Sequence, residues 1–115
     1  MQRRTRKYLF DIQTSISSIY GYLGDTRDFN LYRESKLLRR AVERELEIIG
    51  EAANRLLQLD PHFPIENARR IVDLRNFIIH GYDKVDDAII WGVITKHLPL
   101  LEKQVENSLN IESGS

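Results

Sequence analysis

The chain has 115 residues, 42% of them hydrophobic and 30% charged, which is the composition of one soluble globular domain with a modest core. Its 17 basic and 17 acidic residues give a formal net charge of zero, so a nucleic-acid site must come from local clustering or from oligomerisation. The chain lacks cysteine and any apolar run of the roughly 18–20 residues that cross a bilayer, which excludes disulfides, thiol catalysis and a membrane span, and we expect a cytoplasmic protein.

The first half of the chain predicts two amphipathic helices. Apolar residues follow the three-and-four spacing of a helix over residues 4–23, and Gly24 is placed to end it. After a polar link over residues 25–30, a longer helix is predicted over residues 31–59. Its apolar arc contains Leu31, Leu38, Val42, Leu46, Ile49, Ala53 and Leu56. Glu45 projects into this arc, where we expect it to pair with a cation at an interface or to lie at the edge of the stripe.

The opposite face of this second helix is basic in its first half and acidic in its second half. The basic half is the strongest local cluster of positive charge in the chain and consists of Arg33, Lys36, Arg40 and Arg44. The simplest interpretation is a solvated face with ion pairs four residues apart.

The second half of the chain predicts two more helices. Two prolines within residues 60–64 end the second helix, and a third helix is expected over residues 65–80 with Gly81 as its stop. A fourth helix is expected to begin after an N-cap at Asp86, to reach about residue 110 and to kink at Pro99. Its apolar side is expected to contain Ile89, Val93, His97, Leu100 and Leu101.

Strand-like alternation, internal repeats and signs of a second domain are all absent from the sequence. The fold class predicted is therefore all-α, an antiparallel four-helix bundle. Residues 1–110 are expected to form this single domain, and residues 111–115 a disordered tail.

The end of the third predicted helix carries the most reactive group of side chains, within the run RNFIIHGY. Arg75 falls in the same arc as Ile71, and a guanidinium cannot be buried unpaired without a large penalty. Arg75 must therefore find a carboxylate, face a cleft or lie at an interface. His80 lies roughly 140° further round the helix, so one helix does not aim both groups at one small ligand. Two copies related by a two-fold axis can bring them to a shared cleft.

A purely structural interpretation of the same residues is also available. Arg75 can bridge to a glutamate on the preceding helix, and His80 can cap the last carbonyls, where the helix dipole favours its charged form. The three histidines show no metal-site spacing, so no metal is expected.

Three segments of the chain resemble the HepT-like family of the HEPN superfamily. The run from Arg75 to Tyr82 matches its R-x4-H-x-Y signature, and the run RELEIIGEAA from Arg44 to Ala53 resembles its R-x-L-x-I-I-G-E-A segment. Trp91 followed by LPLL at residues 98–101 resembles its W…L-P-x-L segment. The resemblance covers about residues 8–108.

This resemblance implies a homodimer with a composite cleft and a metal-independent endoribonuclease, in which a ribose 2′-hydroxyl attacks the adjacent phosphorus. It implies that His80 is the general acid and base, that Arg75 holds the scissile phosphate, and that Asn76 helps to orient the phosphate or the histidine. The RNA groove then has to be built locally, and the residues available for it are Arg33, Lys36, Arg40 and Arg44.

The resemblance also implies a partner and a means of control. Members of the family are toxins of type VII two-gene toxin–antitoxin modules, and the antitoxin is a minimal nucleotidyltransferase called MntA. The antitoxin, and not the toxin, uses ATP, so no cofactor is expected for this chain. Tyr82 corresponds to the residue that the antitoxin modifies with AMP. Added bulk and negative charge two residues from His80 are expected to block RNA.

Two other interpretations of the Arg75–Tyr82 run remain open. In one, the chain is a non-enzymatic helical partner that binds a nucleotide or presents substrate to a nucleotidyltransferase. In the other, it is a helical adaptor in which these residues are purely structural.

Overall fold

The computed structural model describes the backbone of residues 2–25, 27–80 and 86–114, and the side chains in these ranges except those of residues 77, 79, 80 and 111–114. The described residues form only helices and their connections, which confirms the all-α fold class. The helices are α1 (Arg3–Leu23), α2 (Phe29–Glu34), α3 (Lys36–Leu59), α4 (Ala68–His80), α5 (Asp87–Gly92), the π-helical turn η1 (Val93–His97) and α6 (Leu98–Gly114).

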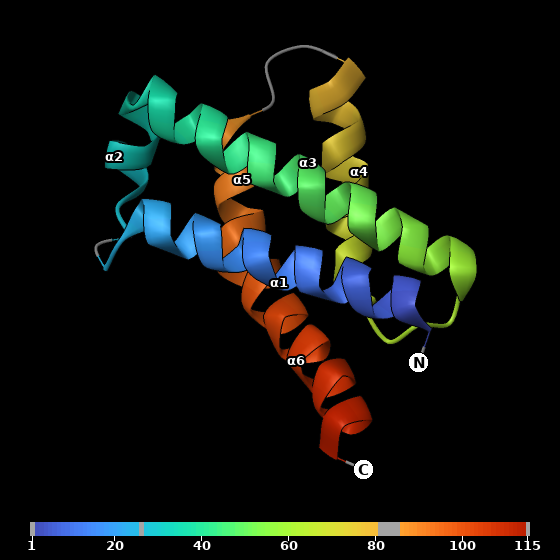
Figure 1. Ribbon diagram of the computed structural model, residues 1–115. Coiled ribbons are helices and arrows are strands. Elements are labelled where there is room, and N and C mark those ends of the chain that lie inside the picture. The colour runs from blue at the N-terminus through green and yellow to red at the C-terminus, as the bar shows by residue number, and fades with distance from the viewer. Residues whose placement is uncertain (1, 26, 81–85, 115) are drawn as a thin grey trace.

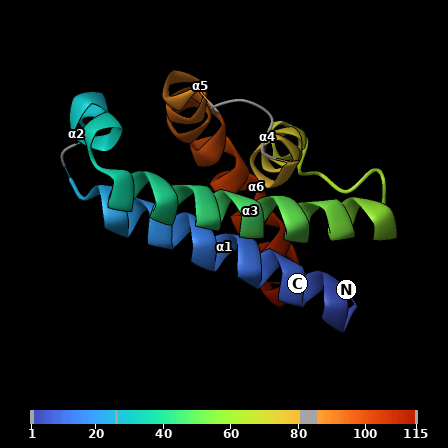
Figure 2. The same ribbon diagram turned by 90° about the horizontal axis from the view of Figure 1, so that it is seen from above.

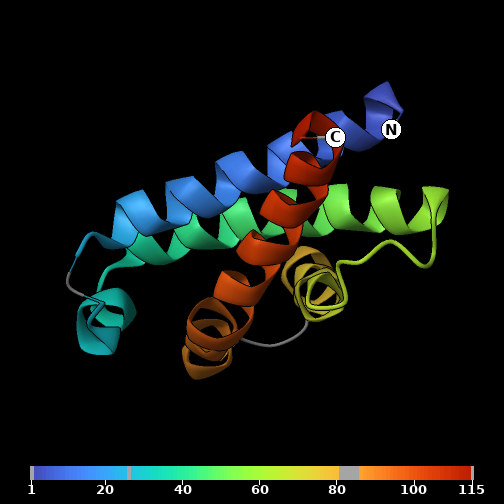
Figure 3. The ribbon, with the colours of Figure 1, turned by 90° about the horizontal axis from the view of Figure 1, so that it is seen from below.

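Two long helices, α1 and α3, lie side by side and run in opposite directions (Figure 1). Helix α4 packs on α3, and seen from above it lies on the side of α3 away from α1 (Figure 2). The rod made by α5, η1 and α6 crosses the α1–α3 pair and contacts α1 (Figure 3). None of the helices in the described ranges is long and apolar enough to span a membrane.

The core lies where these helices meet and is made almost entirely of aliphatic side chains. Fully buried members include Leu9, Ile12, Ile16, Ile19, Val42, Leu46, Ile49, Ile71, Ile90, Ile94, Leu98 and Leu101. Helix α1 ends where predicted, because Gly24 has φ 69° and its N–H donates to the carbonyl of Tyr20.

The predicted helix over residues 31–59 is wrong at its start, because the chain forms two helices there. The Asp28 carboxylate caps α2 by accepting from the N–H groups of Asn30 and Leu31. Ser35 then leaves the helical conformation, and its hydroxyl oxygen accepts from the N–H of Leu38 to begin α3. As a result Leu31 is 57% exposed instead of lying in the core, and Arg33 is on α2 and not on the face of α3.

Glu45 was expected to pair with a cation at an interface or to lie at the edge of the apolar stripe, and it lies half-buried with a neutral side chain as its partner. The Tyr22 hydroxyl of α1 donates to its Oε2 at 2.8 Å, and this hydrogen bond, with partial desolvation, raises the pKa of Tyr22. The contact links the two long helices from outside the core.

Helix α4 begins at Ala68, three residues later than predicted, since residues 60–67 form turns that bury Ile65. Helix α4 buries Ala68, Ile71 and Leu74, and Ile78 packs against the core from a half-buried position.

The last rod begins with the predicted N-cap at Asp86, whose carboxylate accepts from the N–H of Ala88. Pro99 is preceded by one π-helical turn, in which the N–H of Leu98 donates to the carbonyl of Val93. The kink expected at Pro99 stays a prediction. Proline clashes with the carbonyl four residues before it, and a wider turn relieves that contact.

The predicted apolar side of this rod is partly wrong. Ile89 is 59% and Leu100 is 51% exposed, whereas Ile90, Ile94, Leu98 and Val105 are buried beside the predicted Val93 and Leu101. The backbone of α6 is helical to Gly114. The division into a domain of residues 1–110 and a tail of residues 111–115 stays a prediction.

Candidate functional site

Gly50 brings α4 into close contact with α3 at the position of Arg75. A Cβ atom placed on Gly50 would lie 2.7 Å from the Arg75 Cβ and 3.2 Å from the carbonyl oxygen of Ile71. Carbon atoms in van der Waals contact are about 3.5–4.0 Å apart, so no larger residue fits without moving α4. The aliphatic stem of Arg75 therefore crosses α3 directly over this glycine.

The guanidinium of Arg75 is fixed by two oxygen atoms on two helices. Its Nη2 lies 2.5 Å from Glu51 Oε2, and its Nη1 donates to Asn76 Oδ1 at 3.1 Å. The Arg75 side chain is only 22% exposed, and its Nε–H is buried without an acceptor among the described residues. Of the three settings expected for Arg75, a carboxylate, a cleft or an interface, the structure shows the carboxylate. It belongs to Glu51 of the preceding long helix, which is the bridge that the purely structural interpretation expected.

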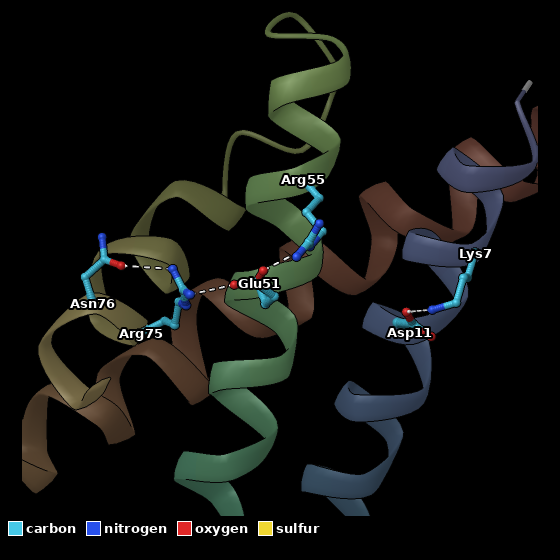
Figure 4. A network of polar contacts seen from close by, with 6 residues as sticks. All are labelled: Lys7, Asp11, Glu51, Arg55, Arg75 and Asn76. Atoms are coloured by element: carbon cyan, nitrogen blue, oxygen red, sulfur yellow. Dashed lines mark hydrogen bonds and ion pairs between the residues drawn. The ribbon is translucent and has the colours of Figure 1, made fainter. Parts of the chain in front are cut away.

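Glu51 is shared between two guanidinium groups. Its Oε1 accepts from Arg55 Nε at 2.9 Å, while its Oε2 pairs with Arg75 (Figure 4). The pKa of Arg55 is raised, first by the hydrogen bond and charge of Glu51 and then by a hydrogen bond with Tyr8. A continuous polar chain therefore joins Arg55 and Glu51 of α3 to Arg75 and Asn76 of α4.

These side chains line a pocket of about 330 Å³ between α1, α3 and α4, which we call the α1–α3–α4 pocket. Its cations are Lys7, Arg44, Arg55 and Arg75, and its anions are Asp11, Glu47 and Glu51. Positive charge is in excess by one, which suits an anionic ligand although the whole chain is neutral.

Only one of the four residues predicted to bind RNA joins this pocket. Arg44 lines it and pairs with Glu47 at 3.2 Å. Arg33 lies on α2 with its guanidinium over the Phe29 ring, and Arg40, at the start of α3, pairs with Glu43 at 3.5 Å. The predicted continuous basic face is therefore interrupted at Ser35.

The other residues of the R-x4-H-x-Y motif lie at the edge of what the structure describes. The backbone of α4 ends at His80, about 7.5 Å along the helix axis from Arg75. The side chain of His80 and the whole of Tyr82 lie outside the described residues. Their roles stay predictions.

The sequence did not identify Gly50 as the contact of Arg75, nor Glu51 as the particular glutamate that pairs with it. Gly50 interrupts a strong helical pattern, and a glycine inside a helix lowers its stability by about 1 kcal/mol relative to alanine, which signals a close contact. Glu51 stands four residues before Arg55, a spacing typical of ion pairs on one helix. Nothing in the sequence spacing indicates that Lys7 and Tyr8 of α1 face these residues.

The histidines whose side chains are described show no metal-binding arrangement. His97 is half-buried, and its Nδ1 lies 3.3 Å from Asn67 Oδ1, as expected of a histidine at the edge of the core. Within the described ranges, no three His, Cys, Asp or Glu side chains gather as a metal site would require.

Comparison with known proteins gives a consistent set of relatives. The model of the family described as "Ribonuclease HepT-like" matches residues 12–108. "Putative RNase MJ1380" of Methanocaldococcus jannaschii is 35% identical over 107 residues, covering 91% of this chain and 96% of that protein. "Probable ribonuclease HepT" of Thermococcus cleftensis is 33% identical over 112 residues, covering 92% and 96%. "Putative RNase TTE0752" of Caldanaerobacter subterraneus is 38% identical over 86 residues, covering 73% and 76%. No solved structure shows significant similarity.

Proposed function

This chain belongs to the Ribonuclease HepT-like family, and from that premise we propose that it is an endoribonuclease whose active site contains Arg75 and His80. The observation that carries the proposal is the setting of Arg75. Its guanidinium is held by Glu51 and Asn76, is mostly buried, and faces a pocket with an excess of positive charge. A pre-oriented guanidinium in a partly desolvated site stabilises charge that develops on a phosphate.

In the proposed reaction the ribose 2′-oxygen forms a bond to the adjacent phosphorus, and the bond from phosphorus to the 5′-oxygen breaks. One proton leaves the 2′-hydroxyl for a base, and one proton is given to the departing 5′-oxygen by an acid. The products are a 2′,3′-cyclic phosphate and a free 5′-hydroxyl. Imidazole suits both proton transfers near neutral pH, and we assign them to His80. The proposed chemistry uses no metal and no cofactor.

A homodimer is part of the proposal. Arg75 points into the α1–α3–α4 pocket, and His80 ends the same helix about 140° further round. Two copies related by a two-fold axis place Arg75 and His80 of both chains around one composite cleft.

We further propose that the chain is the toxin of a type VII module, acting in the cytoplasm, with an MntA-like nucleotidyltransferase as its antitoxin. Family membership and the R-x4-H-x-Y motif support this assignment. AMP transferred from ATP to Tyr82 adds bulk and negative charge next to His80 and so excludes RNA.

The decisive experiment compares His80→Ala with the wild type, freed of adenylate, on a labelled RNA in the presence of EDTA. We expect the wild type to leave cyclic-phosphate ends and His80→Ala to be inactive with its dimer intact. His62→Ala is the matched control, because His62 is an exposed loop residue. If the wild type leaves RNA intact but binds nucleotides, the non-enzymatic partner interpretation replaces this one.

Control by adenylation has its own test. After co-expression with the nucleotidyltransferase encoded beside it, the intact mass should rise by multiples of one AMP. Tyr82→Phe should remain unmodified and active. An unmodified wild type, or modified Tyr82→Phe, contradicts this part of the proposal.

A further inference from the structure

We propose that the part of the α1–α3–α4 pocket formed by Lys7, Tyr8 and Arg55 is a subsite for one single-stranded RNA nucleotide. Its base stacks on the Tyr8 ring, and its phosphate lies on the two cations. The inference rests on the proposed ribonuclease function, because the nucleotide in this subsite is the neighbour of the nucleotide whose phosphate Arg75 holds.

The Tyr8 ring is held as a rigid platform. It is half-buried and packs against the hydrophobic core, yet it also lines the pocket. Arg55 lines the same pocket, and Lys7 Nζ lies 5.9 Å from the ring centroid. An aromatic ring fixed in this way, with cations beside it, is the combination that binds single-stranded nucleic acid without sequence preference.

The cations of this subsite can be recruited by a phosphate. Lys7 pairs with Asp11 and Arg55 pairs with Glu51, each at 2.9 Å and each within one helix. Both cations keep more than half of their side-chain surface exposed, 69% for Lys7 and 54% for Arg55. Exposed pairs of this kind are weak, so a phosphate can compete for the cations with the carboxylates.

The subsite is continuous with the site of proposed cleavage. Glu51 joins Arg55 to Arg75, so a nucleotide held by Arg55 is one carboxylate away from the phosphate held by Arg75 (Figure 4). A pocket of about 330 Å³ is near the lower limit of the roughly 300–1,000 Å³ typical of small-molecule sites. It therefore suits one nucleotide, and a duplex would hide the base face that Tyr8 needs.

The test separates stacking from charge with two probes. One probe is a short fluorescent oligoribonucleotide with 2′-O-methyl groups, which binds without being cleaved, and the other is inorganic polyphosphate, which has the charge but no bases. We expect Tyr8→Leu to weaken RNA binding roughly ten- to a hundredfold and to leave polyphosphate binding unchanged. Tyr8→Phe keeps the ring and should bind RNA nearly as well as the wild type.

The cationic half of the subsite is tested by Lys7→Gln and Arg55→Gln, which should weaken the binding of both probes. Phe10→Leu is the matched control on α1, because Phe10 is 46% exposed and does not line the pocket. Circular dichroism and the melting temperature check the fold. If Tyr8→Leu is unstable, Tyr8→Met replaces it, because methionine fills similar space without an aromatic ring, and RNA affinity equal to that of the wild type then contradicts the subsite.

Two results overturn the inference, and they differ in what they leave standing. If Tyr8→Leu binds RNA as the wild type does while the wild type cleaves RNA, the subsite is wrong and the ribonuclease assignment survives. If Tyr8→Leu weakens both probes equally, the ring has only a structural role. If the wild type neither binds nor cleaves RNA, both proposals fall together.

Discussion

Two basic regions of the molecule, one at the start of α3 and one where α3 meets α4, contain the same kinds of residue but differ in what faces them. At the start of the helix, Lys36 and Arg40 are exposed, and Arg40 pairs with Glu43 of its own helix. Further along, Arg55 and Arg75 share one carboxylate between α3 and α4, beside cations of α1. A charge held between helices keeps its orientation, whereas one paired within an exposed helix face does not. The comparison teaches that the tertiary setting, and not the density of positive charge, distinguishes the candidate site of this neutral chain.

The largest difference between the regions should appear when one arginine is removed from each. Arg75→Ala should lower kcat/KM for RNA by roughly 10²–10³, because the scissile phosphate loses its fixed donor. Arg40→Ala should change it less than about threefold. Equal losses in the two variants would mean that both regions act only through their charge. Single-turnover cleavage of a labelled RNA gives both values.

The close contact of α3 and α4 should matter almost as much as the arginine itself. Gly50→Ala places a methyl group against the Arg75 stem, so we expect a stability loss of about 1–3 kcal/mol and a roughly ten- to hundredfold fall in cleavage as the guanidinium moves. Gly21→Ala is the matched control, since a Cβ there meets nothing within 4 Å. It should leave cleavage unchanged and raise stability slightly. Chemical denaturation and cleavage rates of the two variants decide the point.

Replacing Glu51 should change RNA binding and the rate of cleavage in opposite directions. Glu51→Gln removes a negative charge from the pocket, so RNA should bind about two- to threefold more tightly. It also frees Arg75 from its anchor, so kcat should fall roughly tenfold. Glu47→Gln removes the same charge from the partner of Arg44 and should lower KM without lowering kcat. If both variants change kcat alike, Glu51 has no special positioning role.

The salt dependence of RNA binding should distinguish the cations that line the pocket from those on α2 and at the start of α3. Replacing Arg44 by glutamine should reduce the slope of log affinity against log salt by about 0.7, the value for one phosphate contact on a single strand. Replacing Arg33, Lys36 and Arg40 together should leave the slope unchanged and weaken binding less than about threefold. A reduced slope in the triple variant would mean that RNA also contacts the cations on α2 and at the start of α3.

The smallest effect concerns stability alone, at Glu43. Burial raises the pKa of Glu43, so the folded protein holds this proton to a higher pH than the unfolded chain. Stability is therefore lost as pH rises from the ordinary pKa of glutamate through the raised value. Glu43→Gln should remove this loss and stabilise the protein at pH 7 by less than about 1 kcal/mol, with cleavage unchanged. Melting temperatures measured from pH 4 to pH 8 test the sign.

Much of the fold could be predicted from periodicity and end signals. The spacing of Leu9, Ile12, Ile16 and Ile19, with Gly24 after them, predicts α1 correctly, and Asp86 marks the start of α5. The break at Ser35 was missed because serine is tolerated inside helices, and only the bond to the Leu38 N–H shows that it is a cap. Ile89 and Ile90 are both apolar, so the spacing alone does not decide which of them is buried.

The candidate site was predictable only in part. The position of Arg75 within an apolar arc indicated that it needs a carboxylate, and Glu51 meets that need. The identity of that carboxylate depends on how α4 lies across α3, and the presence of Tyr8 depends on how α1 lies beside α3. Such crossings are set by tertiary packing, which the linear spacing of residues does not encode.

The π-helical turn over Val93–His97 also bears on how this chain should be aligned with its relatives. A π-turn holds one residue more per turn than the α-helix around it. One residue can therefore be added or lost there while α5 and the buried face of α6 keep their orientation. A chain without a proline at this position would have no clash to relieve and could form an unbroken α-helix with one residue fewer. A one-residue gap in an alignment should therefore be placed between residues 93 and 98.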